Sequence, residues 1–281
     1  MNFGGSEVLY DYGSSEIIIV PVPYDETSTW MKGADNGPEA ILEASASLEF
    51  YDLETGTEVH RRGIHTISPL REKNSPEALV NSVYDTVISL LADNKFPVII
   101  GGNHTVSIGA IKAFAAHFKD FTVLQLDAHT DLRQEYEGSG MNHACVMARA
   151  REYAPVVQVG IRSMAAEEVP YAETDRIFPA HKLRYDKSLY SRAVDLLTDN
   201  VYITIDLDVF DPSLMPSTGT PEPGGPDYYE IMHFLRDVAG ERNVTGFDVV
   251  ELCPSPANKA PDFAAAKIIY QLLSYSFSTK C

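Results

Sequence analysis

Three short apolar runs in this chain each lead into a cluster of aspartate and histidine. The runs cover 97–100, 122–126 and 201–205, and each has the length of a buried β-strand. The clusters that follow them are Gly101-Gly102-Asn103-His104, Asp127-Ala128-His129-Thr130-Asp131, and Asp206-Leu207-Asp208. Buried carboxylates and imidazoles are costly to desolvate unless a charge compensates them, and a bound cation does so directly. The pattern therefore favours a sheet whose strand ends bind metal ions.

The rest of the chain alternates between strand and helix patterns. Further strands are expected over 17–20, 156–161, 177–179 and 244–252, and helices over 76–94, 105–118, 188–198, 226–240 and 261–276. Such alternation is typical of α/β proteins, in which one parallel sheet carries helices on both faces. Ligands in these folds bind beyond the carboxyl ends of the strands, where the three clusters fall. No linker interrupts the pattern, so we expect a single domain over 1–281.

The clusters offer six metal ligands: His104, Asp127, His129, Asp131, Asp206 and Asp208. Oxygen-rich ligands with some nitrogen suit Mn²⁺ better than the cysteine-rich sites of structural zinc, although nickel or cobalt could bind the same atoms. Six ligands exceed what one ion needs if it must keep a position for reacting water, so we expect two ions with bridging carboxylates. Ligands at alternate positions would project to one side of an extended chain. A helix cap or turn would explain any one cluster, but not three after three strands.

The composition excludes several classes of protein. The formal net charge is −18, and Arg61-Arg62 is the nearest thing to a basic stripe, so we expect no nucleic-acid partner. The acidity keeps the protein soluble or steers a cationic substrate to its site. No apolar stretch is long enough to span a bilayer, and the first residues lack the pattern of a signal peptide. Three scattered cysteines argue against a disulfide framework, so we expect a cytoplasmic protein.

Two residues outside the clusters are also candidates for the site. His143 follows Asp131 in a glycine-containing loop that returns to a helix, and an imidazole there could carry protons near neutral pH. Glu251 ends the strand over 244–252 and could pair with a planar cation, which a carboxylate holds through two parallel hydrogen bonds. The adjacent Cys253 is interpreted as a packing residue. The remaining histidines are interpreted as surface or packing residues: His60, His65, His117, His181 and His233.

Taken together, these motifs resemble the ureohydrolase family of arginases, agmatinases and their relatives. The resemblance rests on the three clusters and on four further segments, namely Gly33-Ala34-Asp35-Asn36-Gly37-Pro38-Glu39-Ala40-Ile41, Asp211-Pro212, Thr218-Gly219-Thr220-Pro221-Glu222-Pro223-Gly224-Gly225 and Glu251-Leu252-Cys253-Pro254. It covers most of the chain, from about Tyr24 to the last helix. The resemblance implies a three-layer α/β/α sandwich with a central, mainly parallel sheet, assembled as a homotrimer or homohexamer.

The resemblance also implies a role for each site residue. Asp127 and Asp206 would bridge two Mn²⁺ ions per chain, His104 and Asp131 would complete the shell of one ion, and His129 and Asp208 that of the other. His143 falls where the family has a proton-shuttling histidine, and Glu251 where a carboxylate holds the substrate guanidinium. Asp131 would also help to stabilise the tetrahedral intermediate. The chain departs from the family at Asn142-His143-Ala144, where Ser-His-Gly is frequent, and at Cys253, where a small polar residue is usual.

The substrate implied by the resemblance is a small cationic guanidino compound. The loop over 132–138 carries two glutamates and one arginine, and Glu222 stands where arginases are apolar, so both features resemble agmatinases. We therefore expect hydrolysis of agmatine to putrescine and urea, with Glu222, Glu251 and His143 binding the substrate. The alternatives are aminopropylagmatine, guanidinobutyrate, arginine or guanidine. A metal-dependent deacetylase of the same fold and a scaffold without activity are alternatives of another class.

Overall fold

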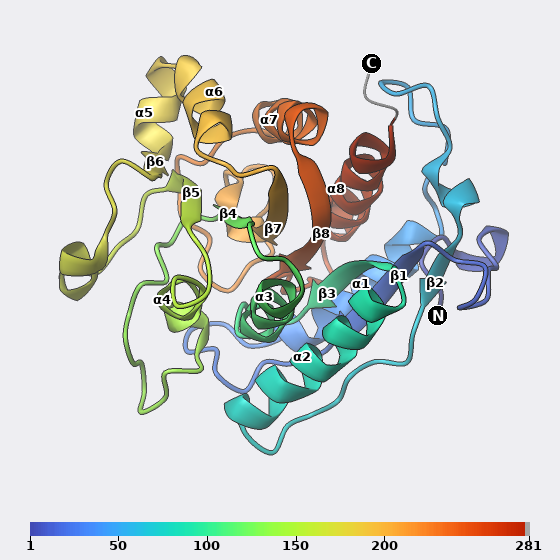
Figure 1. The fold of residues 1–281 in the computed structure, drawn as a ribbon, viewed down its shortest axis with the longest axis horizontal. Helices are drawn as coiled ribbons and strands as arrows, with labels where there is room; N and C mark the ends of the chain where they lie inside the picture. The colour runs from blue at the N-terminus through green and yellow to red at the C-terminus, as the bar shows by residue number, and fades with distance from the viewer. Residues whose placement is uncertain (279–281) are drawn as a thin grey trace.

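The computed structural model describes residues 1–278, and its centre is a sheet of eight parallel strands. The strands are β1 (Ile17–Val22), β2 (Ile64–Thr66), β3 (Phe96–Gly101), β4 (Thr122–Leu126), β5 (Val156–Ile161), β6 (Ile177–Pro179), β7 (Asn200–Asp206) and β8 (Asn243–Val250). Their order across the sheet is β2-β1-β3-β8-β7-β4-β5-β6 (Figure 1). The expected α/β class is confirmed, and every strand pairing is parallel.

Helices cover both faces of this sheet. They are α1 (Gly37–Ser45), α2 (Pro76–Ala92), α3 (Val106–His117), α4 (Val146–Ala150), α5 (Ala180–Tyr185), α6 (Ser188–Asp195), α7 (Tyr228–Glu241) and α8 (Ala260–Phe277). Residues that alternate along β1 belong to different cores: Ile17 and Ile19 pack with α1, α7 and α8, whereas Ile18 and Val20 pack with α2 and α3. Figure 1 shows α2 and α3 on the side of the sheet opposite α7 and α8. The three-layer sandwich is therefore confirmed.

The expected elements agree with the observed ones except at a few positions. Ser75 caps α2 by accepting a hydrogen bond from the backbone of Ala78, as its position before Pro76 predicts. The helix expected to end at Gly240 is α7, which continues to Glu241. Three elements were not expected: β2, α1 and α5. The first has three residues and the last six, too few for a clear periodic pattern.

The order of the strands brings the site together. His104 follows the end of β3, Glu251 directly follows β8, Asp206 is the last residue of β7, and Asp127 directly follows β4. These four strands are consecutive neighbours in the sheet, so their carboxyl ends meet at one edge. Residues far apart in the sequence thus reach one place.

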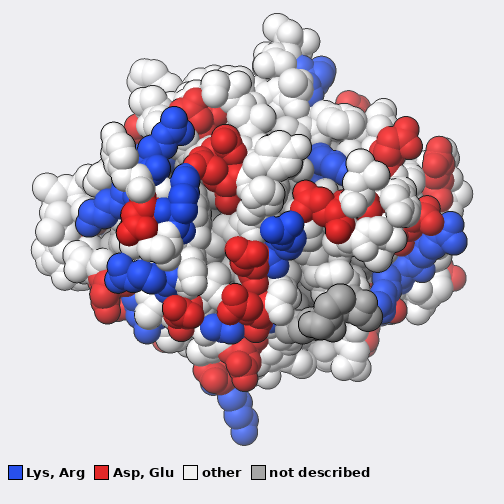
Figure 2. All heavy atoms as spheres, turned by 90° about the horizontal axis from the view of Figure 1, so that it is seen from above, with Lys and Arg blue, Asp and Glu red and all other residues white. Residues whose placement is uncertain are grey.

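Figure 2 shows acidic and basic side chains interspersed on the face it displays. Within 1–278, no helix has the length and apolar character needed to cross a membrane. All the strands described belong to one sheet, while the single domain over 1–281 stays a prediction. Residues 279–281, with Cys281, lie outside the described part of the chain.

Candidate metal centre and active site

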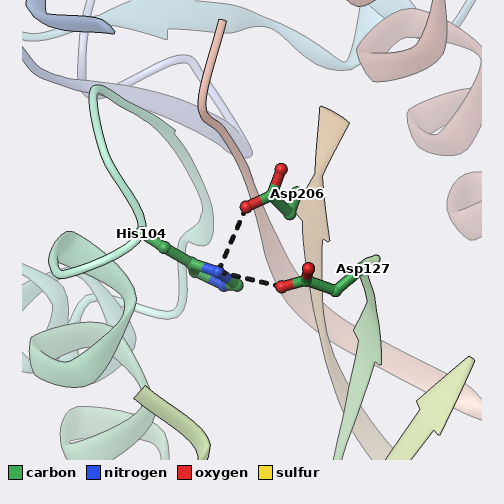
Figure 3. Close-up of side chains that lie close together, drawn as sticks. All are labelled: His104, Asp127 and Asp206. Atoms are coloured by element: carbon green, nitrogen blue, oxygen red, sulfur yellow. Dashed lines mark ion pairs between the residues drawn. The ribbon is translucent and has the colours of Figure 1, made fainter. Parts of the chain in front are cut away.

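Three of the six expected ligands surround an imidazole nitrogen of a fourth, His104. His104 Nδ1 lies 3.2 Å from an oxygen of Asp127, 3.1 Å from one of Asp131 and 3.4 Å from one of Asp206. Figure 3 shows His104, Asp127 and Asp206 converging from the ends of three different strands. All four side chains are buried. The arrangement forms one group of donors suited to a metal ion.

The other two expected ligands form a second group that shares Asp127 with the first. His129 Nδ1 lies 2.9 Å from Asp208 Oδ2 and 3.5 Å from Asp127 Oδ1. The two oxygens of Asp127 therefore face different histidines, one in each group. A carboxylate placed in this way can bridge two ions. Five of the expected ligands thus lie in two groups that share Asp127, and the sixth, Asp131, lies beside the first group through its contact with His104.

The backbone at two of the ligands is not extended, so the alternation of side chains along a strand does not predict their positions. An extended chain was expected through both clusters, but Asp131 has φ of 51° and Asp208 lies in the 3₁₀ turn Leu207–Val209. The Asp206 carboxylate stabilises that turn by accepting a hydrogen bond from Asp208 N at 2.9 Å. Gly102 is required for close packing, because a Cβ there would lie 2.0 Å from the Tyr24 carbonyl oxygen. The expectation of an extended chain was therefore wrong at Asp131 and Asp208.

The electrostatics of the site call for bound cations. Burial, and then the charge of Asp127, raise the pKa of Asp131 to about 7. Burial would lower the pKa of His104, but the surrounding Asp127, Asp131 and Asp206 raise it well above its ordinary value. His104 Nδ1 is buried without a hydrogen-bond partner although three carboxylates surround it. Several acids this close together repel one another, and divalent ions would compensate them better than protons. The residues present therefore fit a metal centre.

A buried hydrogen-bonded chain supports His104 from behind. Its Nε2 lies 2.8 Å from the Thr204 hydroxyl, which donates to Asp248 Oδ1 at 2.6 Å, and Tyr202 donates to Asp248 Oδ2 at 2.6 Å. Such outer contacts fix the orientation of a ligating imidazole. These residues were not predicted from the sequence. Their signal was present, because Thr204 and Asp248 are polar residues whose immediate neighbours in the chain are apolar.

Asp127 has a similar support. Gln125 donates to its Oδ2 at 2.7 Å, and Gln158 in turn donates to Gln125 at 2.5 Å. Glu168 holds the backbone on either side of Asp131 by accepting hydrogen bonds from the Thr130 hydroxyl and from Leu132 N, both at 2.8 Å. These residues were also missed. They keep the segment that carries Asp127 and Asp131 in one conformation.

Glu222 lies beside the second ligand group. Its carboxylate is 3.9 Å from His129 Nε2, too far for a hydrogen bond, and it is not among the residues that line the cavity over the site. Arg162 connects the loop that carries Glu222 to the ligands, because its guanidinium donates to the carbonyl oxygens of Asp208 and Glu222 at 2.7 Å each. Glu222 therefore faces a ligand histidine, and its expected contact with substrate stays a prediction.

All the expected ligands except Asp127 line one cavity of about 180 Å³, together with Glu251 and His143. Glu251 has φ of 68°, in the left-handed region, and its Oε1 accepts a hydrogen bond from His104 N at 2.7 Å. Burial raises the pKa of Glu251 to about 8, because a desolvated carboxylate favours its protonated form unless a cation binds it. Burial, and then the charges of His104 and His129, lower the pKa of His143 to about 4, so its imidazole is neutral near pH 7.

Comparison with known proteins agrees with this geometry. A sequence model of the Arginase family matches residues 15–274. The chain belongs to the arginase family. It is 39% identical to an N(1)-aminopropylagmatine ureohydrolase of Synechocystis sp., covering 96% of this chain and 92% of that protein. It is 32% identical to an agmatinase of Pyrococcus horikoshii, covering 95% and 94%. The crystal structure of agmatine ureohydrolase of Thermoplasma volcanium superimposes with a TM-score of 0.89 at 26% identity, covering 98% and 94%.

This membership confirms two expectations from the sequence. The resemblance to the ureohydrolase family was right, and the arginase-family chain is a hydrolase of the ureohydrolase type. The metal-binding character is supported by the two groups of histidine and aspartate.

Proposed function

We propose that this arginase-family chain hydrolyses a guanidino compound with a cationic polyamine tail and releases urea. The observation that carries the proposal is the position of Glu251 on the wall of the cavity that five of the six ligands line. Burial raises the pKa of this carboxylate to about 8, and a bound guanidinium would stabilise its charged form. A carboxylate accepts two parallel hydrogen bonds from this planar cation, which fixes its orientation.

Two divalent ions would complete the site. We propose that His104 and Asp131 would hold one ion, that His129 and Asp208 would hold the other, and that Asp127 and Asp206 would contribute to both. Manganese is proposed because this donor set combines hard oxygens with imidazole. When bound, the ions supply Lewis acidity and lower the pKa of water at the site.

The protein residues then direct the reaction. Glu251 holds the guanidinium so that water adds to its carbon, and Asp131 helps to stabilise the tetrahedral species that results. The bond between this carbon and the tail nitrogen breaks, and His143 takes up the proton that the adding water releases and passes it to the departing amine. His143 suits this role because its lowered pKa leaves the imidazole neutral and able to accept that proton, and because its Nδ1 is buried without a hydrogen-bond partner. The products are urea and an amine.

The substrate we propose first is N1-aminopropylagmatine, which would yield urea and spermidine, with agmatine second. Three curated relatives between 35% and 39% identical are named as N(1)-aminopropylagmatine ureohydrolases, which supports this order over the agmatine preference drawn from sequence. Agmatine stays a candidate because agmatinases are 32% and 33% identical. Guanidinobutyrate would need a cation for its anionic tail. The candidate for that cation, Arg133, is already paired with Glu167.

A side-by-side assay tests the proposal. Urea release is measured from Mn²⁺-loaded protein offered N1-aminopropylagmatine, agmatine, arginine, guanidinobutyrate and guanidine. We expect the highest kcat/KM with N1-aminopropylagmatine and a measurable one with agmatine. A preference for arginine or guanidinobutyrate would overturn the cationic tail, and no urea from any compound would overturn the function. The homotrimer or homohexamer and the cytoplasmic location stay predictions.

A further inference from the structure

The rim of the cavity carries the only tryptophan in the chain. Trp30 is 77% exposed, yet it lines the same cavity as Asp206 and Glu251. Within 1–278, no aromatic ring or cation stacks on its indole. A tryptophan ring attracts cations to its negative face more strongly than the other aromatic side chains do. The indole is therefore available to a ligand in the cavity.

The loop that carries Trp30 is fastened to the floor of the site. Asn103 Nδ2 donates to the hydroxyls of Thr27 at 2.7 Å and Ser28 at 3.1 Å, one residue before the ligand His104. On the other side of Trp30, the Cys253 thiol donates to the Lys32 carbonyl oxygen at 3.1 Å. Asn103 directly precedes the ligand His104, and Cys253 lies two residues after Glu251. The backbone on either side of the indole is thus held at a fixed place above the guanidinium-binding wall.

The other ring of this kind in the cavity already has a cation. Tyr136 lines the cavity, and the Arg133 guanidinium lies 4.8 Å from the centre of its ring. Arg133 is in turn paired with Glu167, so its charge is compensated. Of the two tyrosine and tryptophan rings that line the cavity, Tyr136 has a cation over it and Trp30 has none.

We propose that the indole of Trp30 forms the subsite for the distal ammonium groups of the substrate tail. The inference rests on the proposed function, because it takes the guanidinium to be bound at Glu251. A tail leaving that position passes outward to the rim. There the face of the indole attracts its ammonium groups. Trp30 thereby favours long polyamine tails over short or uncharged ones.

Enzyme kinetics with matched ligands and variants tests this subsite. For Trp30→Ala, KM for N1-aminopropylagmatine should rise about 2- to 30-fold with kcat unchanged, the range that a cation–π contact spans. KM for butylguanidine, which lacks the ammonium, should stay within about twofold. Trp30→Phe should fall between the wild type and Trp30→Ala. Tyr185→Ala removes another highly exposed aromatic side chain and should change nothing. Equal changes for both compounds, or no change, would overturn the proposal.

Direct binding separates this inference from the proposed function. Because the chain has one tryptophan, its fluorescence reports Trp30 alone. Spermidine added to the Mn²⁺-loaded wild type should change the emission saturably and protect it from iodide quenching. That change without urea release would sustain the subsite and overturn the function. Urea release without that change would do the reverse. A smaller assembly of Trp30→Ala in light scattering would place the indole in a subunit contact and overturn the subsite.

Discussion

The floor and the rim of the cavity differ in how the chain builds them. The floor consists of side chains at the ends of β3, β8, β7 and β4, each supported by buried hydrogen bonds such as that between Thr204 and Asp248. The rim consists of residues in exposed loops, among them Trp30 and Tyr136. The floor is set by the sheet itself, whereas the rim depends on contacts between distant loops.

This difference separates chemistry from specificity. Substitutions at the floor should affect metal binding and turnover with every substrate, because all substrates share the guanidinium group. Substitutions at the rim should affect only the part of the substrate that differs. Substitutions at the floor test whether its residues act on every substrate alike.

Removing the shared ligand should have the largest effect. Asp127→Ala takes oxygens from both donor groups at once. We expect kcat/KM to fall by more than the about 100-fold that loss of an outer contact costs, equally for N1-aminopropylagmatine and agmatine. Bound manganese, measured after dialysis, should fall below two ions per chain. The control Asp237→Ala changes an exposed aspartate on α7 and should leave both values unaltered. Full turnover in Asp127→Ala would contradict the shared bridge.

Neutralising Glu251 should separate binding of the substrate from binding of metal. Glu251→Gln keeps the shape but loses the charged acceptor. We expect KM to rise about 10- to 150-fold, the range for hydrogen bonds to charged groups, and manganese content to stay the same. Steady-state kinetics and metal analysis of the same sample check this. Loss of metal together with binding would show that Glu251 acts through the ligands instead.

Breaking the support behind His104 should weaken metal binding without removing a ligand. Thr204→Val removes the hydroxyl between His104 and Asp248. We expect manganese affinity to fall about 10- to 100-fold, measured by calorimetric titration. Thr245→Val is the matched control, because its hydroxyl donates to a backbone carbonyl, that of Val201, and contacts no ligand. Equal losses in the two variants would assign the effect to general packing.

Metal affinity should rise with pH. Burial would lower the pKa of His129, but the charges of Asp208 and Asp127 raise it well above its ordinary value, and His104 behaves likewise. Both imidazoles therefore hold a proton at pH 7 that an ion must displace. With one proton released per ion, affinity should increase about tenfold per pH unit below these pKa values. Calorimetry in buffers of different ionisation enthalpy counts the protons, and an affinity independent of pH would refute this displacement.

The sequence predicts the floor well and the rim poorly, for a physical reason. Strands ending in Asp and His are local patterns, so the α/β sandwich and the meeting of six ligands follow from reading each segment. The left-handed backbone at Asp131 and the turn at Asp208 do not, because tertiary contacts such as those made by Glu168 stabilise them. Trp30 has no local pattern at all. Its place at the rim depends on Asn103 and Cys253, which are distant in sequence.

The central claim is that six side chains at the floor form a two-metal centre that hydrolyses a guanidinium. The most direct test removes metal with a chelator, returns Mn²⁺ in steps and measures urea release from N1-aminopropylagmatine at each step. The account predicts no release before addition, and a maximum when two ions are bound per chain. Full release without added metal, or a maximum at one ion per chain, would contradict it.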